Sequence, residues 1–529
     1  MTYSLPFEKT NQFNSLVNSY LLKEKQTKSL YNSFPTKNNI IKHSAKKLAN
    51  YKNREVLVSV LSKQNQQLTL SKKQTKNLTL LSNKNTVTIT TGHQLNLLTG
   101  PIYFIYKILQ TIKLCDELNT AQDKIKYVPI FWLASEDHDW QEVNHFYYKN
   151  QKFESKSEAK GCVGEISCDE VKSVFSHFLS QLQEAKYKQQ LVDLVNQSYL
   201  KENISLTEAT RKLVHELFKE YGLLILDGND KELKQLAIPF FKDEINNQSV
   251  QKNITKTNLL IPKNQQQATA REINLFYKDK NLRERIVKKD DLFLVNNQPE
   301  LVFTKEEINK LIENEPEKFS PNVLMRPVYQ EIVLPNVAYV GGGGEIAYWL
   351  QLKSYFDSQK IPFPILVPRN SILLLTEKQQ KKLEKLKISY SDLFLPINEL
   401  INKKIKEKST LKIDFEKIER EVKRIYYFLN KKAQETEKTF GNLVLAQRQK
   451  QLNGLAALEK RVLKAEKIKH QETADRIIKI KEELFPNNNL QERTVNFSEF
   501  YMELGGDFLD TIYKSIVPIH SNFIIKTIN

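Results

Sequence analysis

The hydrophobic positions along the chain follow two different patterns, one before and one after residue 373. Before residue 373, short runs of consecutive apolar residues alternate with segments whose apolar residues recur every three or four positions. Continuous apolar runs are typical of strands buried on both faces, and the three-to-four spacing is typical of amphipathic helices. Beyond residue 373 the chain is highly charged and only the helical spacing remains. We therefore expect an α/β part followed by a long helical part.

Several apolar runs predict the strands of the first part. They lie at 87–90, 127–134, 221–227 and 336–340, and the segment PFPILVPRNSILLL supplies one last buried strand. Most are followed by a glycine-containing turn and a helical pattern such as YFIYKILQTIKLCDEL. Strands that alternate with helices indicate a parallel sheet wound in the Rossmann manner.

Two polar stretches interrupt this alternation and are interpreted as insertions. The first ends in a helix whose N-cap is Ser205 or Thr207, with Glu208 close behind, and the second has no clear periodicity. The predicted organisation is a first part of the core at 1–150, an insertion at 151–210, core at 211–250, an insertion at 251–320, core at 321–372, a helical arm at 373–485, and a segment at 486–529 that returns to the core.

The arm carries two heptad seams. Phe415, Ile418, Val422, Ile425 and Leu429 repeat at spacings of three and four, as do Leu455, Leu458, Val462 and Ala465. Two such seams predict an antiparallel helical coiled coil, and Phe440 and Leu443 fit only after a four-residue shift, which predicts a stutter with a break at Gly441 or Gly454. Because one hairpin covers its seams only in part, we expect a homodimer through the arm.

Composition places the protein in a reducing cytoplasm. Hydrophobic residues make up 40% of the chain, enough for a buried core. Cys115, Cys162 and Cys168 match neither a disulfide framework nor a paired zinc motif, and Cys115 falls on the apolar face of a predicted helix. The beginning of the sequence lacks a signal-peptide pattern, and no run of some 18 apolar residues occurs, so no membrane association is expected.

The net charge of +18 raises the question of nucleic-acid binding. Residues 373–485 hold 27 basic and 17 acidic residues, interleaved along the predicted helices. Such interleaving favours a solvated helical face over an RNA-binding surface. The alternative, a non-catalytic RNA-binding protein, predicts a salt-sensitive gel shift with RNA.

Four unusual sequences follow predicted strands, where open α/β sheets bind ligands. They are Thr91-Gly92-His93-Gln94, Glu136-Asp137-His138-Asp139, Asp227-Gly228-Asn229 and Gly341-Gly342-Gly343-Gly344-Glu345. The first is expected to precede a helix directly, where free N–H groups attract a phosphate or carboxylate. In the alternative interpretation Gly92 serves a turn and His93 satisfies a buried carbonyl.

The acidic sequence needs a cationic partner. Three carboxylates and an imidazole in four residues repel one another unless a cation such as a substrate amine joins them. A carboxylate there is also suited to take a proton from an attacking amine. A helix N-cap cluster is the bland alternative, and no metal site is expected because no second set of ligands is visible.

The glycine run allows close backbone approach, and Glu345 begins the next helix. The run lacks both the GxGxxG spacing and the Walker lysine. Arg326 and Arg369, each beside a proline, are candidate clamps for a carboxylate or phosphate, with structural ion pairs as the alternative.

Taken together, TGHQLNLLTGPIYFIYK, VPIFWLASEDHDWQEVNH, YVGGGGEIAYWLQLK and ILVPRNS resemble the cysteine ligases of bacillithiol biosynthesis. The resemblance spans essentially the whole chain. It implies a core similar to class I aminoacyl-tRNA synthetases, a coiled coil that dimerises, and the condensation of the cysteine carboxyl with the amine of glucosaminyl-malate.

The resemblance also suggests roles for the residues at the strand ends. It makes His93 and Gln94 the counterpart of the phosphate-binding histidine motif of such synthetases, and 135–139 a wall of the same pocket. On this basis the catalytic candidates are His93, Asp137 and His138. The candidates for binding substrate or nucleotide are Thr91, Gly92, Gln94, Glu136, Asp139, Gly341, Gly342, Gly343, Gly344, Glu345, Arg326 and Arg369. The cofactor stays open, with ATP or another adenine nucleotide as the candidate.

Overall fold

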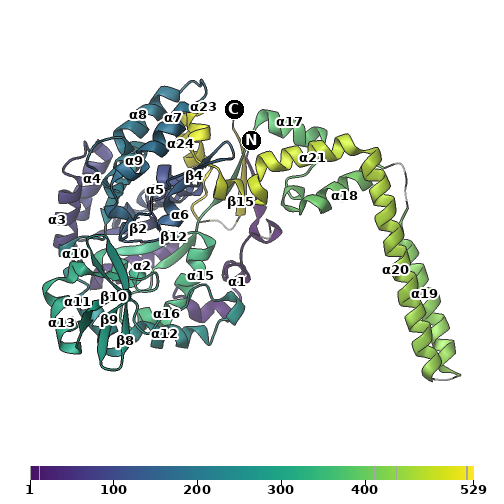
Figure 1. Ribbon diagram of the computed structural model, residues 1–529, viewed down its shortest axis with the longest axis horizontal. Helices are drawn as coiled ribbons and strands as arrows, with labels where there is room; N and C mark the ends of the chain where they lie inside the picture. Colours follow the sequence, from purple (N-terminus) through teal and green to yellow (C-terminus); the bar gives the residue numbers. More distant parts are fainter. Residues whose placement is uncertain are drawn as a thin grey trace. The chain divides into compact units, whose positions relative to one another are not determined.

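The computed structural model describes residues 2–10, 12–409, 411, 413–436, 438–519 and 522–528. Its contacts divide the chain into two compact units (Figure 1). Unit 1 comprises Met1–Leu374 and Asn489–Lys526, and unit 2 comprises Leu375–Asn488 and Thr527–Asn529. The segment after the helical part therefore completes the first unit.

A five-stranded sheet forms the centre of unit 1. Its order is β13 (Ile365–Pro368), β12 (Asn336–Gly341), β2 (Thr86–His93), β3 (Lys126–Leu133) and β6 (Leu224–Asp227), and every neighbouring pair is parallel. The strand order reverses at β2, as in doubly wound nucleotide-binding folds, which places the ligand crevice at the carboxyl ends of β2 and β12. The predicted Rossmann-like α/β core is confirmed.

Both faces of this sheet are buried, which explains the continuous apolar runs. Along β3, Tyr127 packs into one hydrophobic cluster, which also holds residues of α2 (Lys37–Asn50) and α5 (Tyr103–Ala121). Its neighbours Val128 and Ile130 pack into a second cluster on the other face. Cys115 belongs to the first cluster and is a packing residue, as predicted.

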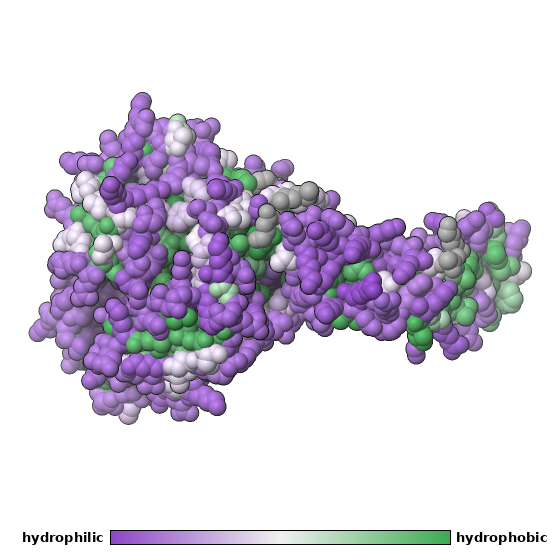
Figure 2. All heavy atoms as spheres, turned by 90° about the horizontal axis from the view of Figure 1, so that it is seen from above, coloured by the Kyte–Doolittle hydropathy of each residue, from purple (hydrophilic) through white to green (hydrophobic). Residues whose placement is uncertain are grey.

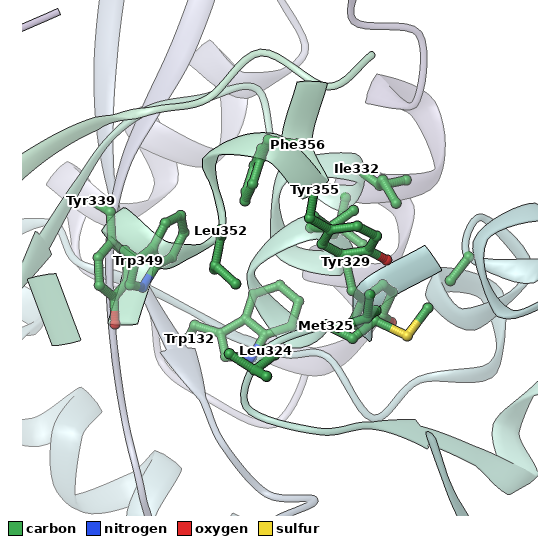
Figure 3. Packing of buried hydrophobic residues seen from close by; sticks show 14 of the residues in the cluster. Trp132, Leu324, Met325, Tyr329, Ile332, Tyr339, Trp349, Leu352, Tyr355 and Phe356 are labelled. Carbon is green, nitrogen blue, oxygen red and sulfur yellow. The ribbon is translucent and has the colours of Figure 1, made fainter. Parts of the chain in front are cut away.

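The second cluster reaches the carboxyl ends of β3 and β12 through Trp132 and Tyr339. Figure 3 shows Trp132, Tyr329, Tyr339 and Trp349 within it. The rings of Tyr339 and Trp349 stack with centroids 4.5 Å apart, and Trp132 meets Tyr329 edge-on at 5.6 Å. Further helices of unit 1 are α1 (Ser15–Leu21), α3 (Arg54–Asn65), α4 (Lys72–Leu81), α14 (Arg326–Val333), α15 (Gly343–Gln351), α16 (Lys353–Ser358), α22 (Gln491–Thr494), α23 (Ser498–Leu504) and α24 (Gly506–Ser515).

The first insertion is mainly helical. It contains β4 (His145–Tyr148), β5 (Gln151–Glu154), α7 (Lys172–Ser180), α8 (Lys188–Tyr199) and α9 (Leu206–Phe218), with the short α6 (Trp140–Val143) before them. Ser205 is the N-cap of α9 and forms a capping box with Glu208, so the first of the two predicted caps is correct.

The second insertion contains regular strands that the sequence pattern did not reveal. An antiparallel sheet has the order β10 (Gln298–Phe303), β9 (Leu292–Val295), β8 (Leu282–Lys289), β7 (Leu275–Asp279) and β11 (Phe319–Pro321), and we call it the inserted sheet. Charged residues on the face opposite the hydrophobic core, among them Arg283 and Arg285, obscured the alternation. Helices α10 (Lys231–Gln235), α11 (Ile238–Asn247) and α12 (Ser249–Asn258) precede it, and α13 (Lys305–Asn314) lies between β10 and β11.

The last predicted strand is two strands in different sheets, so that prediction is wrong. After β13, Arg369 and Asn370 leave the sheet because their polar groups bond to Glu492 and Gln110. The chain then enters β14 (Ser371–Thr376), which joins β15 (Asn522–Ile528) and β1 (Thr2–Pro6) in a three-stranded sheet.

Unit 2 is mainly helical in the residues that the structure describes. Its helices are α17 (Glu377–Lys385), α18 (Ile397–Lys408), α19 (Phe415–Gln434), α20 (Lys438–Lys469) and α21 (Gln471–Leu484), and α19 packs along α20 as the predicted hairpin. The predicted break at Gly441 or Gly454 is wrong, since α20 runs through both. A helical glycine costs only about 1 kcal/mol, which a 32-residue helix tolerates. None of the helices described is long and apolar enough to cross a membrane.

Candidate functional site

A cavity of about 950 Å³ opens in unit 1 at the carboxyl ends of β2, β3 and β12, where the strand order predicts a ligand. Three of the four predicted sequences contribute to it, and the inserted sheet lines it as well. The predicted residues that line the cavity are Gly92, His93, Gln94, Glu136, Asp137, His138, Arg326, Gly342, Gly343, Gly344, Glu345 and Arg369.

Three predicted binding residues lie outside the cavity lining, and their expected ligand contact is corrected to a structural role. The hydroxyl of Thr91 donates to the Val340 carbonyl at 2.8 Å and joins β2 to β12. Asp139 is the N-cap of α6, and the Gly341 carbonyl accepts a hydrogen bond from the Arg369 backbone at 2.7 Å. These residues therefore hold the framework of the site.

The sequence 227–229 is also structural. The Asp227 carboxylate accepts hydrogen bonds from the Ser135 hydroxyl at 2.5 Å and the Asn229 backbone at 2.9 Å. A Cβ atom on Gly228 would lie 2.2 Å from the Trp132 ring, so only glycine fits there. This turn supports the neighbouring strand end without lining the cavity.

His93 does not stand at a helix N-terminus, which corrects the expectation for 91–94. It is the last residue of β2, and α5 begins only at Tyr103. Its ring packs at 5.3 Å from both Tyr103 and Phe104, and its buried Nε2 has no hydrogen-bond partner in the described part of the chain. Burial lowers the pKa of His93 to about 3, with a further contribution from Lys107, so the ring is neutral at physiological pH.

Glu345 is held by a buried lysine that sequence reasoning missed. The Nζ atom of Lys107 donates to the Gly92 carbonyl and to Glu345 Oε2, each at 2.6 Å. Tyr339 and the Gly342 backbone also donate to Glu345, at 2.6 and 2.8 Å. Burial raises the pKa of Glu345, but the charge of Lys107 and the hydrogen bonds from Lys107, Tyr339 and Gly342 together outweigh it and keep the carboxylate ionised. Lys107 was not recognised as a site residue in the sequence because it lies within an apolar helical pattern.

The glycine loop presents a helix N-terminus to the cavity. Gly342 is the N-cap of α15, and a Cβ atom on Gly344 would meet nothing within 4 Å. The first N–H groups of α15 therefore stand beside open space that an anion can occupy.

Arg369 was predicted either to bind a ligand or to form a structural ion pair, and it forms the ion pair. Its Nη atoms donate to both oxygens of the buried Glu492, at 3.1 and 2.7 Å. Its Nε is buried, lacks a partner among the described residues and lies 4.0 Å from the position a Cβ on Gly342 would take. Arg326 donates to Gln330 at 2.9 Å and to Tyr348 at 3.3 Å. One end of the cavity is thus rich in donors.

Two carboxylates of the acidic sequence have different environments. Glu136 Oε1 accepts from the fully buried Lys234 at 2.5 Å, while its Oε2 has no partner in the described residues. Asp137 accepts from Gln94 at 2.7 Å and from the His138 backbone at 2.7 Å. Burial raises the pKa of Asp137, but these hydrogen bonds and the charge of Arg283 outweigh it and hold the pKa well below its usual range. Glu136 is therefore the better placed of the two to receive a cationic group.

Arg283 assigns the tautomer of His138. Its Nη1 lies 2.7 Å from His138 Nδ1, and a guanidinium can only donate, so Nδ1 accepts. The proton of the neutral ring is then on Nε2, which makes His138 a hydrogen-bond donor to a ligand rather than a base.

Arginines are the functional residues that the sequence analysis most clearly missed. Six line the cavity, and among the described residues only Arg369 has a carboxylate partner. Arg271, Arg283 and Arg285 come from the inserted sheet and the segment before it, and Arg493 comes from the C-terminal segment. The pair Arg283 and Arg285, at strand spacing in a charged stretch, was the available signal. The described residues contain no group of three or more His, Cys, Asp or Glu side chains arranged to hold a metal ion.

Comparison with known proteins agrees with this architecture. Residues 1–370 match the family model "Bacillithiol biosynthesis BshC, N-terminal Rossmann-like domain", and residues 372–528 match "Bacillithiol biosynthesis BshC, C-terminal coiled-coil domain". Relatives with the printed name "Putative cysteine ligase BshC" include one from Flavobacterium psychrophilum, 44% identical over 99% of both chains, and one from Flavobacterium johnsoniae, 43% identical over the whole of both. Another, from Staphylococcus carnosus, is 28% identical over 96% of this chain and 97% of its own. The chain therefore belongs to the BshC family of bacillithiol biosynthesis.

Proposed function

We propose that this protein joins the carboxyl group of cysteine to the amine of glucosaminyl-malate, the last step of bacillithiol biosynthesis. The observation that carries the proposal is the cavity at the strand reversal, where an open carboxylate oxygen of Glu136 and a donor nitrogen of His138 stand beside unpaired arginines. An acceptor with an amine and two carboxylates has groups that complement each of these features.

The side chains suggest a division of labour. Glu136 Oε2 receives the acceptor amine and takes the proton that the nitrogen loses as the amide bond forms. The Nε2–H of His138 donates to the carbonyl oxygen of cysteine, which gains negative charge during the attack. The bond that breaks joins the carboxyl carbon to its activating oxygen, and that leaving group departs with the electron pair.

We further propose that the donor-rich end of the cavity holds the anionic group that activates cysteine. His93 Nε2 and Arg369 Nε there lack protein partners among the described residues, and Gly343 and Gly344 in the first turn of α15 line the same cavity. ATP or another adenine nucleotide would supply a phosphate for this position and a leaving group for the carboxyl. The neutral His93 ring would donate a hydrogen bond to it, and Arg326 would add positive charge.

Calorimetric titration of the full-length protein tests the proposal. Glucosaminyl-malate is expected to bind, with affinity reduced about tenfold or more in Glu136→Gln because the amine loses its charged partner. Asp139→Asn is the matched control, since Asn also caps α6 and position 139 does not line the cavity. Equal binding by wild type and Glu136→Gln would remove Glu136 from the site, and no binding by any form would contradict the function.

We also propose that unit 2 pairs with a second copy of the chain. Ile425, Phe428, Leu443 and Leu458, on α19 and α20, expose 55, 60, 65 and 53% of their surface. Figure 2 shows such hydrophobic side chains at the surface of this hairpin. Exposed apolar stripes at heptad spacing favour a two-fold coiled-coil partner.

A further inference from the structure

The inserted sheet turns one face toward the cavity. Side chains alternate along a strand, so Tyr277 and Ile286 enter the hydrophobic core while Phe276, Arg283 and Arg285 occupy the opposite face and line the cavity. Phe276 lies directly across from Arg285 in the strand register, and the Arg283 guanidinium stacks 3.9 Å from the centre of the Phe276 ring. The fold of the insertion therefore directs two arginines into the cavity.

None of these arginines forms an ion pair with a carboxylate in the described part of the chain, although the charges of Glu136 and Asp137 act on Arg283. Arg283 is buried, yet its guanidinium donates only to Ser320 at 3.1 Å, to the Pro321 carbonyl at 3.3 Å and to His138. Arg285 and Arg271 make no side-chain hydrogen bond or ion pair with the described residues. Arg271 and Arg285 are exposed where they line the cavity, so their unpaired guanidinium groups are available to an anionic ligand.

Two nearby lysines, which do not line the cavity, are already neutralised. Lys278 pairs with Glu165 at 2.9 Å, and Lys234 pairs with Glu136 at 2.5 Å. Burial raises the pKa of the neighbouring Cys162 thiol to about 12, so the thiol is uncharged. The positive charge left for a ligand at this wall therefore belongs to the arginines.

We propose that the inserted sheet recognises the carboxylate end of the acceptor, with Arg271 and Arg285 as specificity-determining residues. The inference rests on the proposed function, in which the acceptor carries two carboxylates. A guanidinium binds a carboxylate through two parallel hydrogen bonds, which fixes orientation as well as charge. Arg283 is a positioning residue, because it contacts His138 and links the carboxylate wall to the reacting end of the cavity.

Titration with two acceptors separates this inference from the function on which it rests. Glucosaminyl-malate carries both carboxylates, whereas methyl glucosaminide keeps the sugar and the amine without them. In full-length Arg285→Ala and Arg271→Ala the affinity for glucosaminyl-malate is expected to fall about tenfold or more, the usual effect of losing a charge-assisted hydrogen bond. The affinity for methyl glucosaminide is expected to stay within about twofold of wild type.

Lys289→Ala is the matched control for overall charge. Lys289 lies on the same strand β8 and is exposed, and it does not line the cavity. The control is expected to bind both ligands like wild type, and thermal unfolding checks that all variants fold. An equal loss of affinity in Lys289→Ala, or unchanged affinity in both arginine variants, would overturn the inference.

A different result identifies failure of the function itself. If wild-type protein binds neither acceptor, the proposed function is contradicted, and titration with free malate then decides the inference. Malate binding that weakens in Arg285→Ala and Arg271→Ala supports a dicarboxylate site at the inserted sheet. Malate binding that is absent or equal in wild type and variants overturns it.

Discussion

At the scale of single residues, the site is defined by which polar atoms have partners and which do not. Asp137, Glu345 and the Nη atoms of Arg369 are engaged with protein groups, so they shape the cavity. Glu136 Oε2 and His93 Nε2 have no partner in the described residues, so they are the atoms available to ligands. Sequence reasoning could identify these residue types at strand ends, but it could not tell engaged from available groups, because the partners come from distant segments.

His138 gives the first prediction. Replacing it with alanine removes the Nε2–H donor, and loss of one such donor to a developing oxyanion lowers turnover about 100- to 1000-fold. The side chain is 44% exposed, so the melting temperature should change little. Product formation and thermal unfolding, measured on the same preparation, check both parts. A variant that turns over at the wild-type rate would exclude His138 from the reaction.

The neutral His93 ring gives a pH prediction. Its pKa is about 3 in the folded protein against the ordinary 6.5, so between these values the unfolded chain binds a proton that the folded chain does not. The folded state has its full stability above pH 6.5 and loses up to about 1.4 kcal/mol per pH unit as the pH falls through this window. Thermal unfolding from pH 7 to pH 4 should therefore show a shallower decline in His93→Gln than in wild type. Parallel curves for the two proteins would contradict a neutral buried ring.

At the scale of elements, the parallel strands were predictable and the inserted sheet was not. Strands β3 and β12 are apolar along most of their length, and β2 is buried on both faces with valine and isoleucine between its threonines, so all three could be predicted from the sequence. Strand β8 reads LRERIVKK, because one face meets the core and the other carries arginines for the cavity. The charged residues that line the cavity therefore hide the alternating hydrophobic pattern of the inserted sheet, which is why its site residues were missed.

Glu345 on α15 is hydrogen-bonded to Lys107, which also bonds to β2, and to Tyr339 of β12, and this network gives a prediction about stability. In Glu345→Gln the buried Lys107 loses its carboxylate, which should lower the free energy of unfolding of unit 1 by about 3 kcal/mol. All three tryptophans, Trp132, Trp140 and Trp349, lie in unit 1, so denaturation followed by tryptophan fluorescence reports on it. Adding Lys107→Met to the same protein should restore part of the loss. Unchanged unfolding in Glu345→Gln would show that the pair does not hold the loop.

At the scale of the whole molecule, the two units are expected to serve separate tasks. Every residue that lines the cavity belongs to unit 1, whereas the exposed hydrophobic seams belong to unit 2. The seams were predictable from their heptad spacing, while the uninterrupted course of α20 was not, because a long helix absorbs its glycines.

Replacing residues 413–469 with a short flexible linker tests this division. The shortened protein lacks α19 and α20 and should be monomeric by light scattering at micromolar concentration, while the full-length protein should be dimeric. Its titration with glucosaminyl-malate should match that of full-length protein. A monomeric full-length protein, or a shortened protein that is still dimeric, would exclude the hairpin as the dimer interface.

The most direct test of the central claim measures two metabolites in cells. In a bacillithiol-producing bacterium that lacks its own gene for this family, the wild-type chain and the Asp139→Asn control should restore bacillithiol. Glu136→Gln and His138→Ala, expressed at the same level, should leave bacillithiol absent and glucosaminyl-malate accumulated, as quantified by mass spectrometry of labelled thiols and of the acceptor. Wild-type bacillithiol in both cavity variants would contradict the claim that this cavity joins cysteine to the acceptor.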